Sequence, residues 1–289
     1  MKGQDQKNLR LGLFAVLGVW LTGGIGFPLV DYLKVFTVAQ LMVGRGLVTF
    51  GIPLFIADPQ ELRKTSGASF RAGIWLSLCA YLVFMGFRTW GVNPTVVVTT
   101  LCPVFNFLIA WKKGRQPTVT PLASLAVIVM GVVLALAPWE GSFVPDGFLW
   151  SLGGAVAGAL FAEVLSGKPK EETDMQTSFA LGVPMFVTGL ILSANTGWVL
   201  ILGSHRLLGL LLGFGLLVGF LNLWANAVSI RNLAPEIQTT LVQGETAAAI
   251  LFAGIILGEP MTLLKWLGVS IALCGAWKLG RWLSRREAR

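Results

Sequence analysis

Two charged residues stand inside apolar segments of this sequence, where a charge is costly to place. Glu245 lies in VQGETAAAI (242–250), and Arg45 lies in LMVGRGLVTF (41–50). A charged side chain at the centre of a membrane span costs about 2.5–3.5 kcal/mol on insertion scales and is a functional candidate by default. Glu245 could bind an amine or carry a coupling proton, and Arg45 could clamp a carboxylate or phosphate. Alternatively both are structural, with Arg45 paired to Glu245 or to Glu163.

Uncharged polar and aromatic side chains accompany these charges in other apolar segments. Amides could hydrogen-bond a polar solute, or they could join helices at about 0.6–2 kcal/mol each. The predicted substrate-binding set is Glu245, Arg45, Gln243, Asn106, Asn222, Asn226, Tyr81, Trp20 and Trp224. Glu163 and Arg88 lie near the ends of their segments and are gate candidates. A surface ion pair for Glu163 and snorkelling to the interface for Arg88 are the simpler interpretations.

Several kinds of chemistry lack the residues that they require. His205 is the single histidine and lies in a predicted loop, so a nucleophile–histidine pair is not expected. Cys79, Cys102 and Cys274 lie in apolar runs without metal-ligand spacing, which predicts small packing residues. The sequence has neither a GxxxxGK[ST] phosphate loop nor an HExxH motif. We therefore expect no enzyme activity, no cofactor and no metal.

The composition is typical of a membrane protein with several helices. Of the 289 residues, 55% are hydrophobic and 12% are charged, and the mean hydropathy is +0.74. Soluble domains carry roughly 25% charged residues, about twice this share. The net charge of +8 comes from bases in short loops, where they set membrane orientation, so we expect no nucleic-acid partner.

Ten apolar runs are about long enough to cross a bilayer as helices. They are 11–30, 36–57, 70–88, 92–111, 119–138, 147–167, 176–194, 207–229, 234–257 and 262–282. The first run lacks a convincing signal-peptide cleavage site and is kept as a helix. The sequence thus predicts an all-α polytopic membrane protein with ten transmembrane helices.

Lysine and arginine are distributed unevenly between the two sides of this topology. With the N-terminus inside, the cytoplasmic segments hold 17 of the 22 bases and the outer segments hold four. Because cytoplasmic loops carry an excess of Lys and Arg, both termini are expected to be cytoplasmic. The predicted location is the inner (plasma) membrane.

Two stretches of the sequence echo each other at a shift of about 140 residues. TVVVTTLCPVFNFLIAW (95–111) resembles PEIQTTLVQGETAAAILFAGIIL (235–257), and both contain TTL. The tails that follow also correspond, each with a loop proline and a glycine near the end of the next span: Pro117 and Gly131, then Pro260 and Gly275. The predicted five-helix repeats are 1–140 and 141–289. Because five is odd, the second is inverted relative to the first, which is typical of secondary transporters.

Four segments are similar to the motifs of a known family: VLGVWLTGG (16–24), GRGLVTF (44–50), LCPVFNFLIAW (101–111) and IILGEPMTLLKWLGVSIALCGAW (255–277). On these segments the sequence resembles the ten-helix EamA-type proteins of the drug/metabolite transporter superfamily. The resemblance covers nearly the whole chain. Two segments depart from the family pattern: GRQP (114–117) and GALFAE (158–163). The resemblance implies a transporter, commonly an exporter of amino acids, other small metabolites or drugs.

Together these features predict a secondary transporter, and more specifically an exporter, of small polar metabolites such as amino acids. It would use a central cavity and alternating access, with the lipid bilayer as its surroundings and protons as a candidate coupling ion. A monomer and a homodimer are both compatible with the sequence. The alternatives are a multidrug or organic-cation exporter, and a non-transporting lipid-handling protein. The last would have Arg45 and Glu245 bonded to each other in a dry core.

Overall fold

The computed structural model describes residues 2–114, 119–136, 143–169, 171–233, 235–256 and 262–287. Within these ranges the chain forms helices and no strand, so the all-α prediction is confirmed for them. The helices are α1 (Lys2–Tyr32), α2 (Val38–Ile56), α3 (Pro59–Leu62), α4 (Gly67–Trp90), α5 (Val92–Thr99), α6 (Cys102–Lys112), α7 (Val119–Leu136), α8 (Pro145–Ser166), α9 (Asp174–Leu192), α10 (Trp198–Leu202), α11 (His205–Phe214), the π-helical η2 (Gly215–Leu221), α12 (Asn222–Asn232), α13 (Pro235–Val242), α14 (Gly244–Ile256) and α15 (Leu263–Glu287).

Each of the ten predicted apolar runs coincides with helical structure, although their lengths differ. In the described part of the chain, seven helical segments are long and apolar enough to cross a membrane. They comprise α1, α2, α4, α8, α9, the continuous α11–η2–α12 segment and the α13–α14 segment. Three predicted runs, at α5–α6, α7 and α15, are not among these seven. Some of the predicted segments extend beyond the described residues. These parts are positions 137–138, 234 and 257 of the apolar runs, 115–117 of GRQP, and 257–261 of the motif at 255–277.

Two of the predicted runs are broken helices rather than continuous ones. The first break separates α5 from α6 at Thr100 and Leu101, and Pro103 follows in the first turn of α6. The second break separates α13 from α14 at Gln243. There the N–H of Gln243 donates to Thr240 at 3.3 Å, a tighter i to i−3 contact than an α-helix makes. At the first break the N–H of Leu101 likewise donates to the carbonyl of Val98, three residues back, at 3.0 Å.

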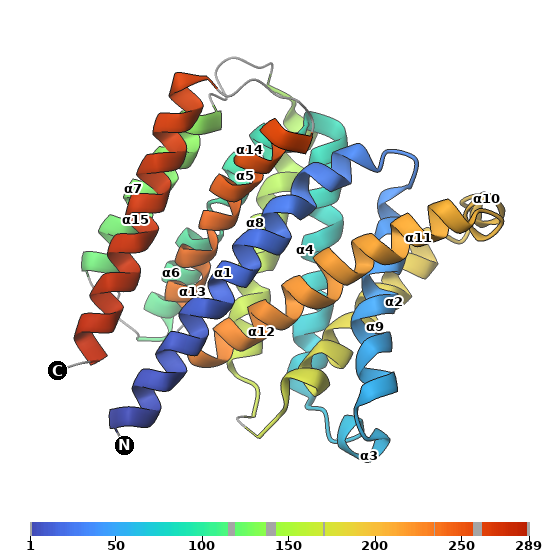
Figure 1. The fold of residues 1–289 in the computed structure, drawn as a ribbon, viewed down its shortest axis with the longest axis horizontal. Coiled ribbons are helices and arrows are strands. Elements are labelled where there is room, and N and C mark those ends of the chain that lie inside the picture. The colour runs from blue at the N-terminus through green and yellow to red at the C-terminus, as the bar shows by residue number, and fades with distance from the viewer. Residues whose placement is uncertain are drawn as a thin grey trace.

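The helices pack as a bundle in which segments far apart in sequence lie side by side (Figure 1). Helix α4 packs against α8, α2 against α9, and α7 against α15, while α1 lies against α12 and α14. The two chain ends lie at the same end of the bundle as α3 (Figure 1). The start of α15 lies at the opposite end (Figure 1).

Glycines allow these helices to approach each other closely. A Cβ atom on Gly73 of α4 would lie 2.5 Å from the carbonyl oxygen of Ala180 in α9. A Cβ on Gly215 of η2 would lie 2.3 Å from the carbonyl oxygen of Gly44 in α2. Neither distance is compatible with a side chain, so the backbones touch directly, as in small-residue contacts between membrane helices.

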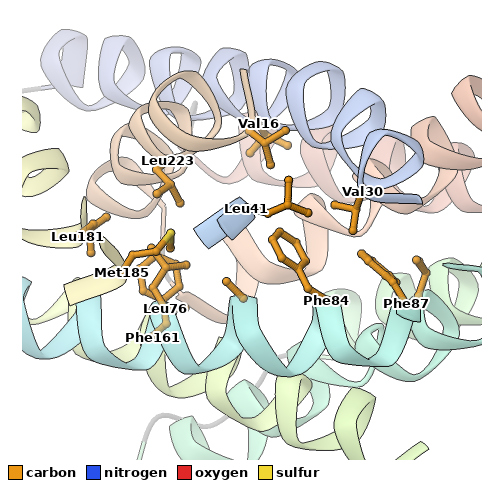
Figure 2. Packing of buried hydrophobic residues seen from close by; sticks show 14 of the residues in the cluster. Val16, Val30, Leu41, Leu76, Phe84, Phe87, Phe161, Leu181, Met185 and Leu223 are labelled. Atoms are coloured by element: carbon orange, nitrogen blue, oxygen red, sulfur yellow. The ribbon is translucent and has the colours of Figure 1, made fainter. Parts of the chain in front are cut away.

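Apolar side chains fill the space between the helices and also cover the outside. Val16, Leu41, Phe84, Met185 and Leu223 are among the buried residues that meet between α1, α2, α4, α9 and α12 (Figure 2). Large apolar residues are also exposed on the outer faces: Phe14, Phe55, Ile191, Ile255 and Leu263 are at least 70% accessible. Soluble proteins rarely expose such apolar surface, but lipid is a suitable partner for it.

Gly46 and Gly51 of α2 provide a matched test of helix contact. A Cβ on Gly46 would lie 2.4 Å from the backbone nitrogen of Phe186 in α9, whereas a Cβ on Gly51 meets nothing within 4 Å. We expect Gly46→Ala to destabilise the protein by about 1–3 kcal/mol through overpacking. Gly51→Ala should keep or raise stability because alanine favours helix. Thermal unfolding in detergent measures both, and equal Tm values would contradict the close α2–α9 contact.

Candidate functional site

A cavity of about 180 Å³ lies in the middle of the bundle. Its wall combines residues of α1, α2, α4 and α8 with residues of α12 and of the two broken helices. Five of the predicted binding residues line it: Arg45, Asn222, Asn226, Gln243 and Glu245. Cavities of roughly 150 Å³ in proteins hold a molecule the size of benzene, so this one suits a small solute.

Glu245 opens helix α14 and points into space that a glycine leaves free. A Cβ on Gly23 of α1 would lie 1.4 Å from Glu245 Oε1, so the carboxylate occupies the place of the missing side chain. A Cβ on the preceding Gly244 would lie 2.1 Å from the ring of Trp20. Glu245 lies in the first turn of α14, where the helix dipole favours a negative charge. Each residue of Gln243-Gly244-Glu245 thus has a separate role. Gln243 separates α13 from α14, Gly244 leaves space for the ring of Trp20, and Glu245 directs its carboxylate toward Gly23.

Hydrogen-bonded amides extend from the carboxylate along α12 and α13. Asn222 Nδ2 lies 3.5 Å from Glu245 Oε1, and Asn226 Nδ2 donates to Asn222 Oδ1 at 3.1 Å. Gln238 Nε2 donates to Asn226 Oδ1 at 3.0 Å and to Ser229 Oγ at 3.1 Å. The chain of contacts holds each amide in one orientation, which presents a fixed polar wall to the cavity.

Arg45 is the cationic residue of the cavity wall, and its side chain is 8% exposed. Within the described part of the chain its side chain makes no hydrogen bond or ion pair, and its buried Nε is without an acceptor. Its guanidinium carbon lies 6.0 Å from the ring centroid of Phe84, a cation–π contact. Arg45 and Glu245 are close enough to interact electrostatically but form no direct ion pair.

The other predicted binding residues lie outside the cavity wall. Trp20 donates from its indole nitrogen to the carbonyl of Leu241 at 2.8 Å. Tyr81 packs edge-on against Trp150, and Trp224 is 42% exposed on the outer surface. The structure thus places these three aromatic residues in helix contacts or at the surface.

Asn106 is buried and joins the two broken helices, again outside the cavity wall. Its Nδ2 donates to Thr239 Oγ1 of α13 at 3.3 Å, whereas its Oδ1 is buried without a donor. Of the two interpretations of the buried amides, Asn106 therefore fits the second, in which the amide joins two helices by a hydrogen bond.

Several residues of the cavity wall were not singled out from the sequence. Phe84 and Phe161 supply aromatic surface, Gln238 supplies an amide, and Cys79 and Cys102 supply thiols. Gln238 lies in the polar stretch at the start of the run 234–257, where no sequence signal indicates that it reaches the cavity. The cysteines are small and apolar in pattern, and no sequence signal separates a thiol in a cavity wall from one in a core.

The two gate candidates contact neighbouring elements. Lys113 donates to Glu163 Oε1 at 2.7 Å, which joins the end of α6 to α8. Arg88 Nη2 donates to the carbonyls of Leu33 and Phe36, at 3.3 and 2.9 Å. Glu163 therefore forms the surface ion pair, and Arg88 fixes the turn between α1 and α2.

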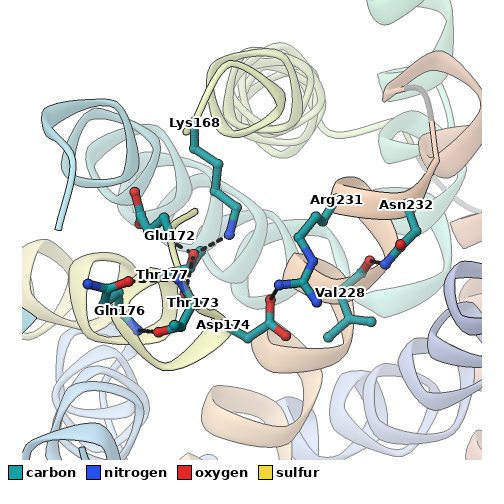
Figure 3. A network of polar contacts seen from close by, with 9 residues as sticks. All are labelled: Lys168, Glu172, Thr173, Asp174, Gln176, Thr177, Val228, Arg231 and Asn232. Atoms are coloured by element: carbon teal, nitrogen blue, oxygen red, sulfur yellow. Dashed lines mark hydrogen bonds and ion pairs between the residues drawn. The ribbon is translucent and has the colours of Figure 1, made fainter. Parts of the chain in front are cut away.

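A polar network closes the end of the bundle that holds the chain termini (Figure 3). Arg231 of α12 pairs with Asp174 of α9 at 3.1 Å. The ammonium group of Lys168 contacts the hydroxyl of Thr177. Burial lowers the pKa of Lys168, and the carboxylates of Asp174 and Glu172 oppose this shift. The network ties the loop before α9 to the end of α12.

The fold and the cavity define a class: an all-helical protein with several helices long and apolar enough to cross a membrane, and with charged residues in the wall of an internal cavity. No family model and no curated protein matches the chain. One solved crystal structure is similar to it over 97% of this chain and 98% of that chain, with a TM-score of 0.71 and 15% sequence identity. At that identity the likeness establishes a shared fold alone.

The thiols of Cys79 and Cys102 offer a test of the cavity. A Cβ on Gly158 of α8 would lie 3.4 Å from Cys79 Sγ and 3.5 Å from Cys102 Sγ. In a Cys274→Ser background, Gly158→Leu should slow labelling of both thiols by methyl methanethiosulfonate by about tenfold or more, because leucine fills the space beside them. Gly213→Leu is the control, since a Cβ there meets nothing within 4 Å. Equal labelling rates in the two variants would exclude this cavity as the route to the thiols.

Proposed function

We propose that the protein is a ten-helix secondary transporter, an exporter of small polar metabolites such as amino acids, that works by alternating access. The observation that carries this proposal is a central cavity in which Arg45 and Glu245 stand without a direct bond to each other. Intramembrane charges normally pair or line a water-filled path. Because Arg45 and Glu245 do not pair with each other, both charges are available to bind a polar solute in the cavity.

The packing of the helices supports the inverted repeat. In a twofold arrangement of two five-helix halves, α1, α2, α4, α5–α6 and α7 would correspond to α8, α9, α11–η2–α12, α13–α14 and α15. The contact of α4 with α8 then has its counterpart in α12 with α1, and α4 with α9 has its counterpart in η2 with α2. The contacts of α2 with α9 and of α7 with α15 would each be their own counterpart and would lie on the proposed axis.

Individual glycines follow the same correspondence. Gly73 lies against the carbonyl of Ala180, as Gly215 lies against that of Gly44. In the helix pair α7–α15, Cβ atoms on Gly131 and Gly275 would lie 3.0 Å from Ala272 Cα and 2.9 Å from Ile128 Cγ1. These are the two glycines that the sequence repeat aligns. Inverted repeats with a binding site between them are typical of secondary transporters.

The position of the cavity favours transport over a scaffold or lipid-handling role. Its wall draws on both proposed halves, with Arg45 and Cys79 from the first and Asn222 and Glu245 from the second. Both broken helices reach it, at Cys102 and at Gln243. Discontinuous helices around a midplane site are a recurrent feature of transporters. The resemblance to EamA-type exporters points the same way.

Counterflow in proteoliposomes with a mixed pool of amino acids and polyamines, analysed by mass spectrometry, tests the proposal. We expect selective exchange by the wild type and a loss of about tenfold or more for Glu245→Gln, since the amide cannot bind a cation or carry a proton. Glu171→Gln, at an exposed loop position, is the matched control. Exchange of polyamines but not amino acids would favour the organic-cation alternative. Absence of any exchange would favour the non-transporting one.

A further inference from the structure

The side chain of Arg45 is a buried cation in the cavity wall. It is more than nine-tenths buried, it lines the cavity, and it has no protein acceptor among the described residues. A buried charge without a partner is strongly unfavourable, and arginine remains protonated in proteins. The cation–π contact with Phe84 satisfies none of its N–H donors. The acceptors must therefore come from the content of the cavity.

The stem of Arg45 is fixed in place before any ligand arrives. A Cβ on Gly219 of η2 would lie 3.1 Å from Arg45 Cγ and 2.7 Å from its carbonyl oxygen, so α2 and η2 are in close contact there. Thr49 donates its hydroxyl to the same carbonyl at 2.7 Å. A guanidinium on a fixed stem loses little freedom when it binds a carboxylate through two parallel hydrogen bonds.

We propose that Arg45 binds the carboxylate of the substrate and that Glu245 binds its ammonium group, so that the transported class is the zwitterionic amino acids with an apolar side chain. This deepens the proposed function and rests on it. The two charges of the wall sum to zero, which matches a zwitterion and opposes a bare cation or a bare anion. Apolar residues complete the wall for the remaining part of the solute: Phe27, Leu76, Phe84 and Phe161.

Three solutes that differ by one charged group test this proposal. They are leucine, isoamylamine, which lacks the carboxylate, and 4-methylpentanoate, which lacks the ammonium group. Counterflow of each is measured in proteoliposomes after subtraction of protein-free liposomes. In the wild type, leucine should exchange at least about tenfold faster than either analogue, because each analogue leaves one buried charge unpaired. Isoamylamine exchange equal to that of leucine would overturn the role of Arg45 while leaving a transporter.

Variants of Arg45 separate binding from folding. Arg45→Gln should abolish the preference for leucine over isoamylamine, and Arg45→Lys should retain part of it because lysine keeps the charge without the two-pronged geometry. Arg71→Gln, at an exposed position of α4, is the control. Unchanged selectivity in a folded Arg45→Gln protein would overturn the proposal. Failure of all three solutes to exchange in the wild type would overturn this substrate class, and the mixed-pool exchange would still decide the transporter proposal.

A separate observation concerns the starts of α2 and α9, where the sequence repeats one capping device. Thr37 and Gln40 cap α2 through reciprocal side-chain to backbone hydrogen bonds, and Thr173 and Gln176 cap α9 in the same way. This is the capping box, in which a glutamate can replace the glutamine. The second pair belongs to the polar network of Figure 3.

In both boxes the spare amide nitrogen of the glutamine reaches the other half of the chain. Gln40 Nε2 donates to Thr196 Oγ1 at 3.3 Å, and Gln176 Nε2 donates to the carbonyl of Glu61 at 2.5 Å. Because α2 and α9 pack in opposite directions, with Gly46 against Phe186 and Gly182 against Phe50, the two contacts lie at opposite ends of the bundle. The contact of Gln176 is at the end with the chain termini (Figure 1).

We infer that Gln40 and Gln176 are paired latches that hold the two halves together, one at each end of the bundle. Opening the cavity toward one side requires the halves to separate at that end, which breaks the hydrogen bond there and leaves the other intact. The Gln176 end is held more firmly, because Glu172 Oε2 also accepts the backbone N–H of Ser66 at 3.2 Å.

Glutamate variants break one latch without removing the cap. Gln40→Glu and Gln176→Glu keep the acceptor oxygen of the capping box and lose the amide donor. The reporter is labelling of Cys79 and Cys102 by the membrane-impermeant reagent 2-sulfonatoethyl methanethiosulfonate, applied from either side in a Cys274→Ser background. Gln176→Glu should raise labelling from the side of the termini, and Gln40→Glu should raise it from the opposite side. Thr196→Ala removes the hydroxyl that accepts the hydrogen bond of Gln40, so it should also raise labelling from the side opposite the termini.

The labelling assay needs no substrate, so its outcome is independent of which solute is carried. Opposite shifts in the two glutamate variants support the latches. Unchanged side preference in both variants, or a shift toward the same side, would overturn them. Counterflow then decides the transporter proposal separately.

Discussion

An apolar helix bundle that carries charges must satisfy them from within, and this requirement organises the centre of the molecule. Lipid offers no hydrogen bonds, so each buried polar group needs a protein partner or a polar cavity. Glu245 meets the requirement with the amide of Asn222, whereas Arg45 faces the ring of Phe84 and the cavity. The carboxylate of Glu245 is therefore held by a protein partner, whereas the guanidinium of Arg45 keeps its hydrogen-bond donors available for a ligand.

Close backbone contact is what allows such a cavity to exist at a defined size. Where glycines remove side chains, as at Gly46, Gly73 and Gly215, the helices touch and their relative positions are fixed. Where a glycine faces the centre, as at Gly23, the space goes to a functional group from another helix. Glycine thus has two roles in this protein, and its position in the helix decides which one applies: it allows two backbones to pack closely, or it leaves space for a side chain from another helix.

The helical segments could be predicted from the sequence because a run of about 20 apolar residues has few other structures available. The break at Gln243 could not, because Gln and Gly also occur within continuous helices and the contact of Trp20 with Gly244 at the break is a tertiary one. The charged members of the site were found because charge is rare in such segments. Trp20 and Asn106 were assigned to the cavity on residue type alone, and the structure shows partners in Leu241 and Thr239 that only tertiary packing could supply.

The π-helical segment η2 has a consequence for the energetics of the two halves. Its wider turn, with the N–H of Asn222 directed to the carbonyl of Leu217 five residues back, offsets everything that follows by a fraction of a turn. The segment α4, which would be its counterpart, is an unbroken α-helix of 24 residues. In the proposed arrangement of two similar halves, this irregularity makes the halves unequal beside Asn222 and Glu245. For the proposed transporter, the states that open toward opposite faces of the membrane would then be different conformers with different free energies, and the bias would arise from one local irregularity in one helix.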